Sequence, residues 1–360
     1  IDDIKTQFSE CLESGFVTNN GKYVKKFELD LKEYLSSKIK PLVFCNGEMA
    51  LYNLIQAWKE ELGFDHNKSF KVLVPSFTFS GTVNAIVKNN LEPVFCDIDD
   101  TMTINLQKID NVKNAKMIIA VGAYGTLPNI EQLIDFSKKY NLVLILDNAP
   151  SFGIKYKNKF PCNYNISEIW SFHATKVLSS MEGGGALSNN EKIMKRIEYL
   201  RNFGQKELVR GNIESLGLNS KMQEISAIVG IYNLSRFKET LLLRRIIIDK
   251  YKNIFNEMIE DNRIDVMRVS KNTLCNFTFY PIILKEDADN FVKYMKYKNI
   301  EVRRYYTAVH ELDFYRNKYT QLNLDFTNNI KDKIVALPLH SGMSDNKIEF
   351  LFDSVKSYFN

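Results

Sequence analysis

Six short apolar segments alternate with helical patterns between residues 41 and 172, and this alternation constrains the fold more than any other feature. Their apolar residues are continuous rather than alternating, which is typical of strands in a sheet covered on both faces. Strands that alternate with helices predict an α/β fold built on a doubly wound sheet. The segments cover residues 41–45, 71–75, 91–97, 116–121, 142–146 and 169–172.

The rest of the chain predicts helices and a second, smaller unit. Residues 1–40 have the pattern of helix, turn and helix, and residues 191–260 are predicted to be mostly helical. From about residue 262, strands alternate with helices, which indicates a small α+β domain. We therefore expect a large domain over 1–240 and a small C-terminal domain over 241–360. The strands expected in the small domain are 277–284 and 301–306, and the helices are 288–298 and 347–358.

Composition narrows the class of protein. The 360 residues carry a net charge of +5 with scattered Lys and Arg, so the sequence predicts no nucleic-acid partner. Five dispersed cysteines without a C-x-x-C pair are typical of free thiols in a reducing compartment. No apolar run approaches the length of a membrane span, and no signal-peptide pattern is found. We expect a cytoplasmic protein with no membrane partner and no metal.

Polar residues stand where the predicted strands end. Gly47, Thr78, Asp97, Asp147 and Lys176 each follow an apolar segment. In open α/β sheets, ligands bind at the carboxyl ends of strands. These five residues are therefore the candidates for one shared site.

Lys176 follows an apolar run and precedes the glycines at 183–185. A lysine that attacks a carbonyl carbon needs a partly desolvated pocket that lowers its pKa. The glycines would let the backbone approach a bulky ligand closely. The alternative is a surface lysine before a glycine turn.

The polar residues at the strand ends match the parts of a pyridoxal phosphate site. Asp147 would pair with a protonated ring nitrogen and Phe79 would stack on the ring, while Lys176 would form an imine. Gly47, the N–H of Glu48, and Ser171 would hold the phosphate. Each residue also has an ordinary structural interpretation: Asp147 as a helix N-cap, Phe79 as core and Ser171 as a strand hydroxyl. The residues alone leave both readings open.

The sequence resembles the DegT/DnrJ/EryC1/StrS family of pyridoxal-phosphate-dependent sugar aminotransferases over nearly its whole length. The most specific match is Ser-Phe-His-Ala-Thr-Lys at 171–176. The other matching segments, in order, are 17–21, 46–51, 74–79, 93–98, 147–153, 182–184, 217–224 and 337–340.

This resemblance implies a fold, a cofactor and a set of roles. The fold is that of the type I aminotransferases, with a mostly parallel mixed sheet between helices and a smaller C-terminal α+β domain. Lys176 would bond to the cofactor and later move the proton, and Asp147 would pair with the pyridine nitrogen. Phe79 would stack on the ring, and Gly47, Glu48 and Ser171 would bind the phosphate. Asn219 would reach the cofactor of a neighbouring subunit, which implies a homodimer with shared active sites.

Two positions depart from the family pattern. Glu48 stands where Thr is frequent, and we expect its carboxylate to point away from a phosphate. Pro150 stands where a Gln, His or Glu usually lies near the phenolic oxygen of the cofactor, and Asn148 or water is the expected substitute. Lys176 is retained, whereas relatives that dehydrate the sugar carry His there. The sequence therefore favours amino transfer over dehydration.

The implied reaction moves an amino group from L-glutamate to a nucleotide-linked keto-deoxysugar. The stretch around Lys176 resembles the branch that aminates C-4 of dTDP-4-keto-6-deoxyglucose, and the product would be an amino sugar for a surface glycan such as lipopolysaccharide. A C-3 aminotransferase acting on a dTDP-3-keto-6-deoxyhexose is the alternative. His173 is interpreted as a packed structural histidine. The candidate sugar-nucleotide contacts are His310, Arg303, Arg304, Tyr305, Tyr306 and His340, for which a surface role is equally open.

Three other classes of protein would require different sequence features. A nicotinamide-dependent oxidoreductase should carry G-x-G-x-x-G after its first strand, and the sequence has none. A non-catalytic protein of the same fold should lack the lysine or the aspartate, and both are present. A relative that acts on a cyclitol or a non-sugar ketone stays open.

Overall fold

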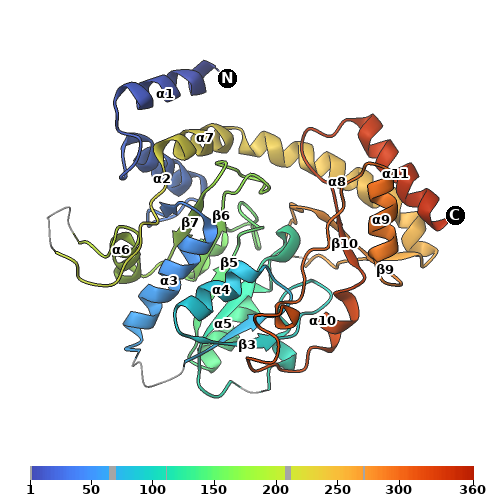
Figure 1. The fold of residues 1–360 in the computed structure, drawn as a ribbon, viewed down its shortest axis with the longest axis horizontal. Coiled ribbons are helices and arrows are strands. Elements are labelled where there is room, and N and C mark those ends of the chain that lie inside the picture. The colour runs from blue at the N-terminus through green and yellow to red at the C-terminus, as the bar shows by residue number, and fades with distance from the viewer. Residues whose placement is uncertain (1, 65–69, 111, 207–211, 271) are drawn as a thin grey trace.

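A computed structural model of the chain describes residues 2–64, 70–110, 112–206, 212–270 and 272–360. Within these residues, seven strands form one sheet in the order β1-β7-β6-β5-β4-β2-β3 (Figure 1). Only β7 runs against its neighbours, so six strands share a direction and the sheet is mixed but mostly parallel. This confirms the predicted fold class. The bounds are β1 (Leu42–Phe44), β2 (Lys71–Pro75), β3 (Glu92–Cys96), β4 (Ala115–Val121), β5 (Val143–Asp147), β6 (Ser167–Ser171) and β7 (Gly184–Leu187).

The sheet is covered on both faces, as the continuous apolar strands predict. Ile145 of β5 packs in the same core as the helices α3 and α4, while Leu144 and Leu146 pack in the core that α5 covers. Helices α2, α6 and α7 add to the first of these cores. The helices around this sheet are α1 (Asp2–Glu13), α2 (Lys22–Tyr34), α3 (Gly47–Glu61), α4 (Ser80–Lys88), α5 (Ile130–Lys139), α6 (Glu191–Leu200) and α7 (Glu224–Ser235).

Strand β7 is the element of this sheet that the sequence did not predict. Its glycines were interpreted as room for a ligand, but Gly184 serves the contact between β7 and the turn before α3. A Cβ at Gly184 would lie 2.4 Å from the carbonyl carbon of Asn46. Gly184 therefore lets β7 lie against the start of α3, where the site lies.

A second sheet lies toward the C-terminus. It has the order β10-β9-β8 and is antiparallel throughout, and we call it and its helices the small lobe, and the seven-stranded unit the large lobe. The long helix α8 runs from one lobe to the other, and the expected boundary after residue 240 falls within its first turn (Figure 1). The bounds are α8 (Phe237–Glu260), β8 (Ile264–Val266), β9 (Tyr280–Leu284), α9 (Asp289–Tyr297), α10 (Asp325–Ile330), β10 (Ile334–Leu337) and α11 (Asp345–Phe359).

Some of the predicted elements are wrong. Residues 301–306 do not form a strand: Arg303 makes an isolated bridge with Ala336, and the segment then leaves the sheet. Strands β8 and β10 were not predicted. The stretch 191–260 is helical only in α6, α7 and α8, and its residues 207–211 lie outside the described residues. Single turns of 3-10 helix occur at Leu106–Lys108, Ala123–Gly125, Pro161–Tyr164 and Val309–Glu311. None of the helices described is long and apolar enough to cross a membrane.

Candidate active site

A cavity of about 370 Å³ opens at the carboxyl ends of the strands of the large sheet. Its floor comes from the ends of β5 and β6 and its sides from the first turns of α3 and α4. The small lobe supplies the remaining wall through residues 278–279, 303 and 305–306. Six of the seven residues expected in the catalytic and cofactor set line it: Gly47, Glu48, Phe79, Asp147, Ser171 and Lys176.

Lys176 lies in the loop between β6 and β7, where its backbone N–H donates to the carbonyl of His173 at 2.9 Å. Burial lowers the pKa of its amine, and the charge of Asp147 partly opposes that shift. The lysine is therefore not the surface residue of the alternative reading. A lowered pKa leaves more of the amine unprotonated and nucleophilic.

Asp147 ends β5 with its side chain buried at the cavity floor. One carboxylate oxygen accepts a hydrogen bond from Thr82 Oγ1 at 2.7 Å, and the other accepts from the N–H of Ala149 at 3.0 Å. Burial nevertheless raises the pKa of Asp147, against the effect of these donors and of Lys176. A cation in the cavity would relieve this desolvation, which suits a protonated ring nitrogen.

The first turn of α3 has the features of an anion site. Asn46 caps the helix by accepting from the N–H of Met49 at 2.8 Å. A Cβ at Gly47 would lie 3.0 Å from the Cβ of Ser171, so the backbone of this turn sits directly against Ser171. Glu48 pairs with Lys88 of α4 at 3.4 Å. This ion pair is consistent with the expectation that the Glu48 carboxylate points away from a phosphate.

Phe79 stands just before α4, and 62% of its side chain is exposed. This contradicts the reading of Phe79 as a core residue. A large exposed aromatic ring on the wall of a cavity is suited to cover the face of a flat ligand.

The surroundings of Pro150 correct one expectation. Asn148 does not substitute for the missing polar group: it is buried, it is not among the described residues that line the cavity, and its Nδ2 donates to Glu168 Oε2 at 2.7 Å. The carbonyl of Pro150 accepts from Thr278 Oγ1 at 2.6 Å. Thr278 therefore ties the small lobe to the strand end that carries Asp147.

The candidate substrate residues fall into two groups. Arg303, Tyr305 and Tyr306 line the cavity, and the guanidinium of Arg303 donates to the hydroxyl of Tyr305 at 2.8 Å. His340 lies in an exposed turn, where its Nδ1 accepts from the N–H of Gly342 at 3.2 Å. His310 is buried, with its Nδ1 2.6 Å from Ser76 Oγ. His310 and His340 are thus not among the described residues that line the cavity.

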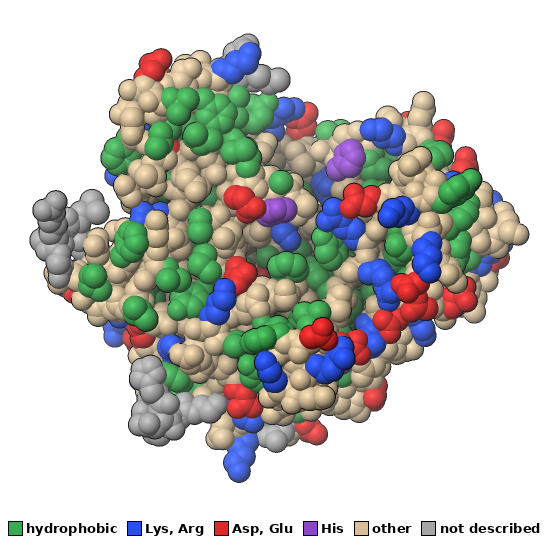
Figure 2. Space-filling view, viewed as in Figure 1, with side chains coloured by type: hydrophobic (Ala, Val, Ile, Leu, Met, Phe, Trp, Pro, Cys, Tyr) green, Lys and Arg blue, Asp and Glu red, His purple; other side chains and the backbone are tan. Residues whose placement is uncertain are grey.

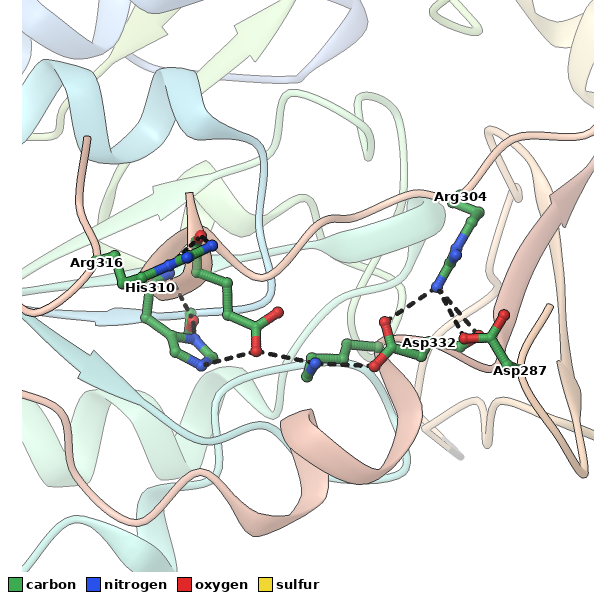
Figure 3. A network of polar contacts seen from close by, with 8 residues as sticks. Asp287, Arg304, His310, Arg316 and Asp332 are labelled. Atoms are coloured by element: carbon green, nitrogen blue, oxygen red, sulfur yellow. Dashed lines mark hydrogen bonds and ion pairs between the residues drawn. The ribbon is translucent and has the colours of Figure 1, made fainter. Parts of the chain in front are cut away.

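Figure 3 shows why Arg304 points elsewhere. Its guanidinium bonds to Asp332 at 3.0 Å and lies 3.8 Å from Asp287. Lys331 and Glu311 continue this network of polar contacts to His310. The network joins the small lobe to Ser76, which stands at the start of the loop that carries Phe79.

His173 and Asn219 are the two remaining candidate residues. His173 is not a packed structural residue: 45% of its side chain is exposed and it lines the cavity beside Glu182, 3.6 Å away. Asn219 lies at the surface, where its Oδ1 accepts from Lys221 Nζ at 2.7 Å. It is not among the described residues around this cavity.

Sequence reasoning missed Thr82, Thr278 and Glu182. Thr82 lies three residues after Phe79 in the first turn of α4, and a hydroxyl at that spacing beside a strand-end loop was an available signal. Thr278 comes from the other lobe, and nothing in its local sequence marks it.

The described residues fit pyridoxal phosphate. The cavity joins a buried carboxyl, a desolvated amine and a helix start held close to a serine by a glycine. These are the groups that a ring nitrogen, an aldehyde and a phosphate require.

Comparison with known proteins agrees with this fit. The model of the DegT/DnrJ/EryC1/StrS aminotransferase family matches residues 1–356. The chain is 30% identical to dTDP-4-amino-4,6-dideoxy-D-glucose transaminase of Shigella dysenteriae, covering 94% of this chain and 91% of that protein. It is 26% identical to GDP-perosamine synthase of Vibrio cholerae, covering 98% and 95% of the two chains. A DegT/DnrJ/EryC1/StrS aminotransferase from Brucella abortus has the same fold, with a TM-score of 0.89, 22% identity and coverage of 99% and 95%.

Proposed function

Because the chain belongs to the DegT/DnrJ/EryC1/StrS aminotransferase family, which makes it a transaminase with pyridoxal phosphate as its cofactor, we propose that it aminates a nucleotide-linked keto-deoxysugar with L-glutamate as the donor. The observation that carries the proposal is the pairing of a desolvated Lys176 with a buried Asp147 across one cavity. Such opposed titratable groups are typical of catalytic centres.

Pyridoxal phosphate, when bound, carries the amino group between the two substrates and delocalises the negative charge that develops on the reacting carbon. Asp147 keeps the ring nitrogen protonated, and Thr82 holds its carboxylate in place at 2.7 Å. Lys176 Nζ removes a proton from the donor carbon and returns one to the acceptor, as base and then acid. Its lowered pKa suits both directions of transfer.

The other cavity residues bind and orient. The N–H groups of Gly47 and Glu48 with Ser171 hold the phosphate, and Phe79 covers the ring. Arg303, Tyr305 and Tyr306 face the incoming sugar nucleotide from the small lobe. A guanidinium at the cavity wall suits a diphosphate or a carboxylate.

We propose dTDP-4-keto-6-deoxyglucose, aminated at C-4, as the preferred acceptor. The support is the 30% identity to the Shigella dysenteriae transaminase, whose name specifies a 4-amino-4,6-dideoxyglucose linked to dTDP. The likeness to GDP-perosamine synthase makes a GDP-linked sugar the rival nucleotide. Amination at C-3 of a dTDP-3-keto-6-deoxyhexose is the rival position.

A homodimer with shared sites is part of the proposal. Leu216 and Leu218, which precede Asn219, are 84% and 37% exposed, and Leu12 and Phe16 are exposed near the N-terminus. Figure 2 shows hydrophobic side chains gathered over the N-terminal helices at the upper left. Apolar surface of this kind supports burial against a second copy.

The first test is the visible spectrum of the purified protein during addition of L-glutamate. We expect a yellow protein whose band shifts as the amino group is transferred, and borohydride reduction should fix the cofactor on Lys176 in the peptide map. A protein that neither contains nor takes up pyridoxal phosphate would contradict the site. Return of the original band by dTDP-, GDP- or UDP-linked 4-keto and 3-keto sugars then identifies the acceptor.

Subunit mixing tests the shared site. Lys176→Ala and Asn219→Ala should each be impaired alone. In a refolded equal mixture, half of the dimers are mixed, and one of their two sites carries both intact residues, so about a quarter of wild-type activity should return. Absence of recovery would contradict the role of Asn219 across the interface.

A further inference from the structure

Pro150 leaves one question that the proposed function does not answer. The cofactor carries a phenolic oxygen beside its reacting carbon, and an ionised oxygen in a buried cavity needs a donor. Pro150 has no N–H and its side chain cannot donate. The donor must therefore come from another element that reaches this side of Asp147.

The nearest polar groups are already committed. Asn148 is not among the described residues that line the cavity, and its Nδ2 donates to Glu168 Oε2. Ser151 Oγ donates to the carbonyl of Gly122. Thr278 Oγ1 donates its one proton to the carbonyl of Pro150. Thr82 Oγ1 donates to Asp147. A hydroxyl has a single proton, so none of these three hydroxyls can serve a second acceptor.

Tyr306 is differently placed. Its ring lines the cavity and is held by three aromatic neighbours: Phe77 at 5.7 Å in an edge contact, Tyr124 at 5.5 Å and Tyr305 at 5.7 Å between ring centroids. The backbone N–H of Tyr124 favours the ionised form of the Tyr306 hydroxyl, which places Tyr124 beside that oxygen. The carbonyl of that same Tyr124 accepts from the N–H of Thr278, so Tyr306 stands beside the contact that occupies Pro150.

The proton of Tyr306 is available for a ligand. Among the described residues, the Tyr306 hydroxyl makes no hydrogen bond to a protein acceptor, and Tyr306 lines the cavity. Burial first, and then the charge of Asp147, raise the pKa of Tyr306. The phenol therefore stays protonated and remains a donor near neutral pH.

We infer that the hydroxyl of Tyr306 donates a hydrogen bond to the phenolic oxygen of pyridoxal phosphate, and so replaces from the small lobe the contact that Pro150 cannot make. The inference rests on the proposed placement of the ring between Asp147 and Phe79. It makes Tyr306 a cofactor residue rather than only a contact for the sugar. It also links cofactor binding to the position of the small lobe, since Arg303 pairs with Ala336 of β10 and Tyr306 packs against the core of that lobe.

The test compares Tyr306→Phe with two matched variants. Tyr305→Phe removes a neighbouring hydroxyl that serves Arg303, and Tyr124→Phe removes a buried hydroxyl without a partner among the described groups. The measurements are the dissociation constant of pyridoxal phosphate from each apoprotein and the visible absorption maximum of each loaded protein. Neither depends on turnover.

Tyr306→Phe should bind pyridoxal phosphate roughly 10- to 100-fold more weakly, because a hydrogen bond to an ionised oxygen is lost. Its absorption maximum should move, since the charge on the phenolic oxygen is no longer held. The two control variants should keep the wild-type maximum. An unchanged dissociation constant and maximum in Tyr306→Phe would overturn the inference. Failure of the wild-type protein itself to bind the cofactor would instead overturn the proposed site.

Discussion

Two buried carboxyls lie on neighbouring strands, Asp147 at the end of β5 and Glu168 near the start of β6, and they differ in almost everything except burial. Asp147 ends β5 and pairs in register with Ile169 of β6, so the next residue back, Glu168, points to the other face of the sheet. Asp147 meets a hydroxyl, an N–H and the ammonium of Lys176. Glu168 meets Asn148 at 2.7 Å and the indole N–H of Trp170 at 3.1 Å, both neutral.

The difference shows that burial alone does not mark a functional acid. Burial raises the pKa of both groups, and it raises that of Glu168 to about 7. What distinguishes Asp147 is an opening to a cavity and a lysine within electrostatic reach. Glu168 has neither, and its Oε1 has no hydrogen-bond partner among the described groups.

Neutralising each carboxyl in turn should give the largest contrast. Asp147→Asn should lower kcat/KM at least about 1,000-fold, roughly 4 kcal/mol of transition-state stabilisation, because the ring nitrogen loses its anion. Glu168→Gln should stay within about threefold at pH 7. Steady-state kinetics on the loaded enzymes measures both losses, and equal losses in the two variants would show that the two carboxyls do not differ in function.

The titration of Glu168 should appear in the pH dependence of the free energy of unfolding. Glu168 has a native pKa of about 7 against 4.5 when unfolded, so the native state holds more protons between these values. Its contribution to stability is therefore present below pH 4.5 and is lost as the pH rises to 7, by at most about 3 kcal/mol. Urea unfolding at a series of pH values should find Glu168→Gln gaining relative to wild type across this window. A constant difference between the two proteins would show that Glu168 does not titrate there.

The hydroxyl that holds Asp147 should have a smaller effect. Thr82→Val removes its 2.7 Å bond and should lower kcat about tenfold, since a hydrogen bond to a charged group contributes roughly 1.5 to 3 kcal/mol. Thr82→Ser keeps the hydroxyl and should be close to wild type. Matching losses in both variants would indicate that the methyl group matters rather than the bond.

A third carboxyl, Glu48, extends the comparison to a group in an exposed ion pair. Lys88→Met removes its partner, and the affinity for pyridoxal phosphate should fall by less than about threefold, because an exposed ion pair contributes under about 1 kcal/mol. Glu48→Gln in the same background should restore the loss. Titration of the apoproteins with the cofactor measures both, and a tenfold loss would mean that Glu48 turns toward the phosphate once Lys88 is gone.

Much of the large lobe was predictable because its strands are continuous apolar segments that end in polar residues. Asp147, Lys176 and Phe79 were found in that way, and the structure gathers them around one cavity. Strand β7 escaped because a glycine-rich strand carries no apolar pattern; its place depends on how closely it approaches Asn46.

The residues that the small lobe supplies to the cavity were harder to predict from the sequence, because their positions depend on tertiary contacts. Residues 301–306 have the composition of a strand, but they turn away after Arg303 to face the cavity. Thr278 and Tyr306 matter through Pro150 and Tyr124, which lie more than 120 residues earlier in the chain. Local sequence does not encode such pairings. His310 and His340 illustrate the converse, since a histidine near the right motif says nothing about where its ring points.

The helix α8 has a practical consequence for exchanging parts between relatives. It is one uninterrupted helix of 24 residues, and its first residue, Phe237, packs against the large lobe next to Gly153 and Phe152. A chimera cut after residue 240 would splice two foreign sequences inside the first turn of that helix. A junction at Arg236, between α7 and α8, would transplant the whole helix with the wall that carries Arg303, Tyr305 and Tyr306. Such a chimera would test new acceptor sugars with Lys176 and Asp147 unaltered, provided that the contact between the rings of Phe237 and Phe152 is kept.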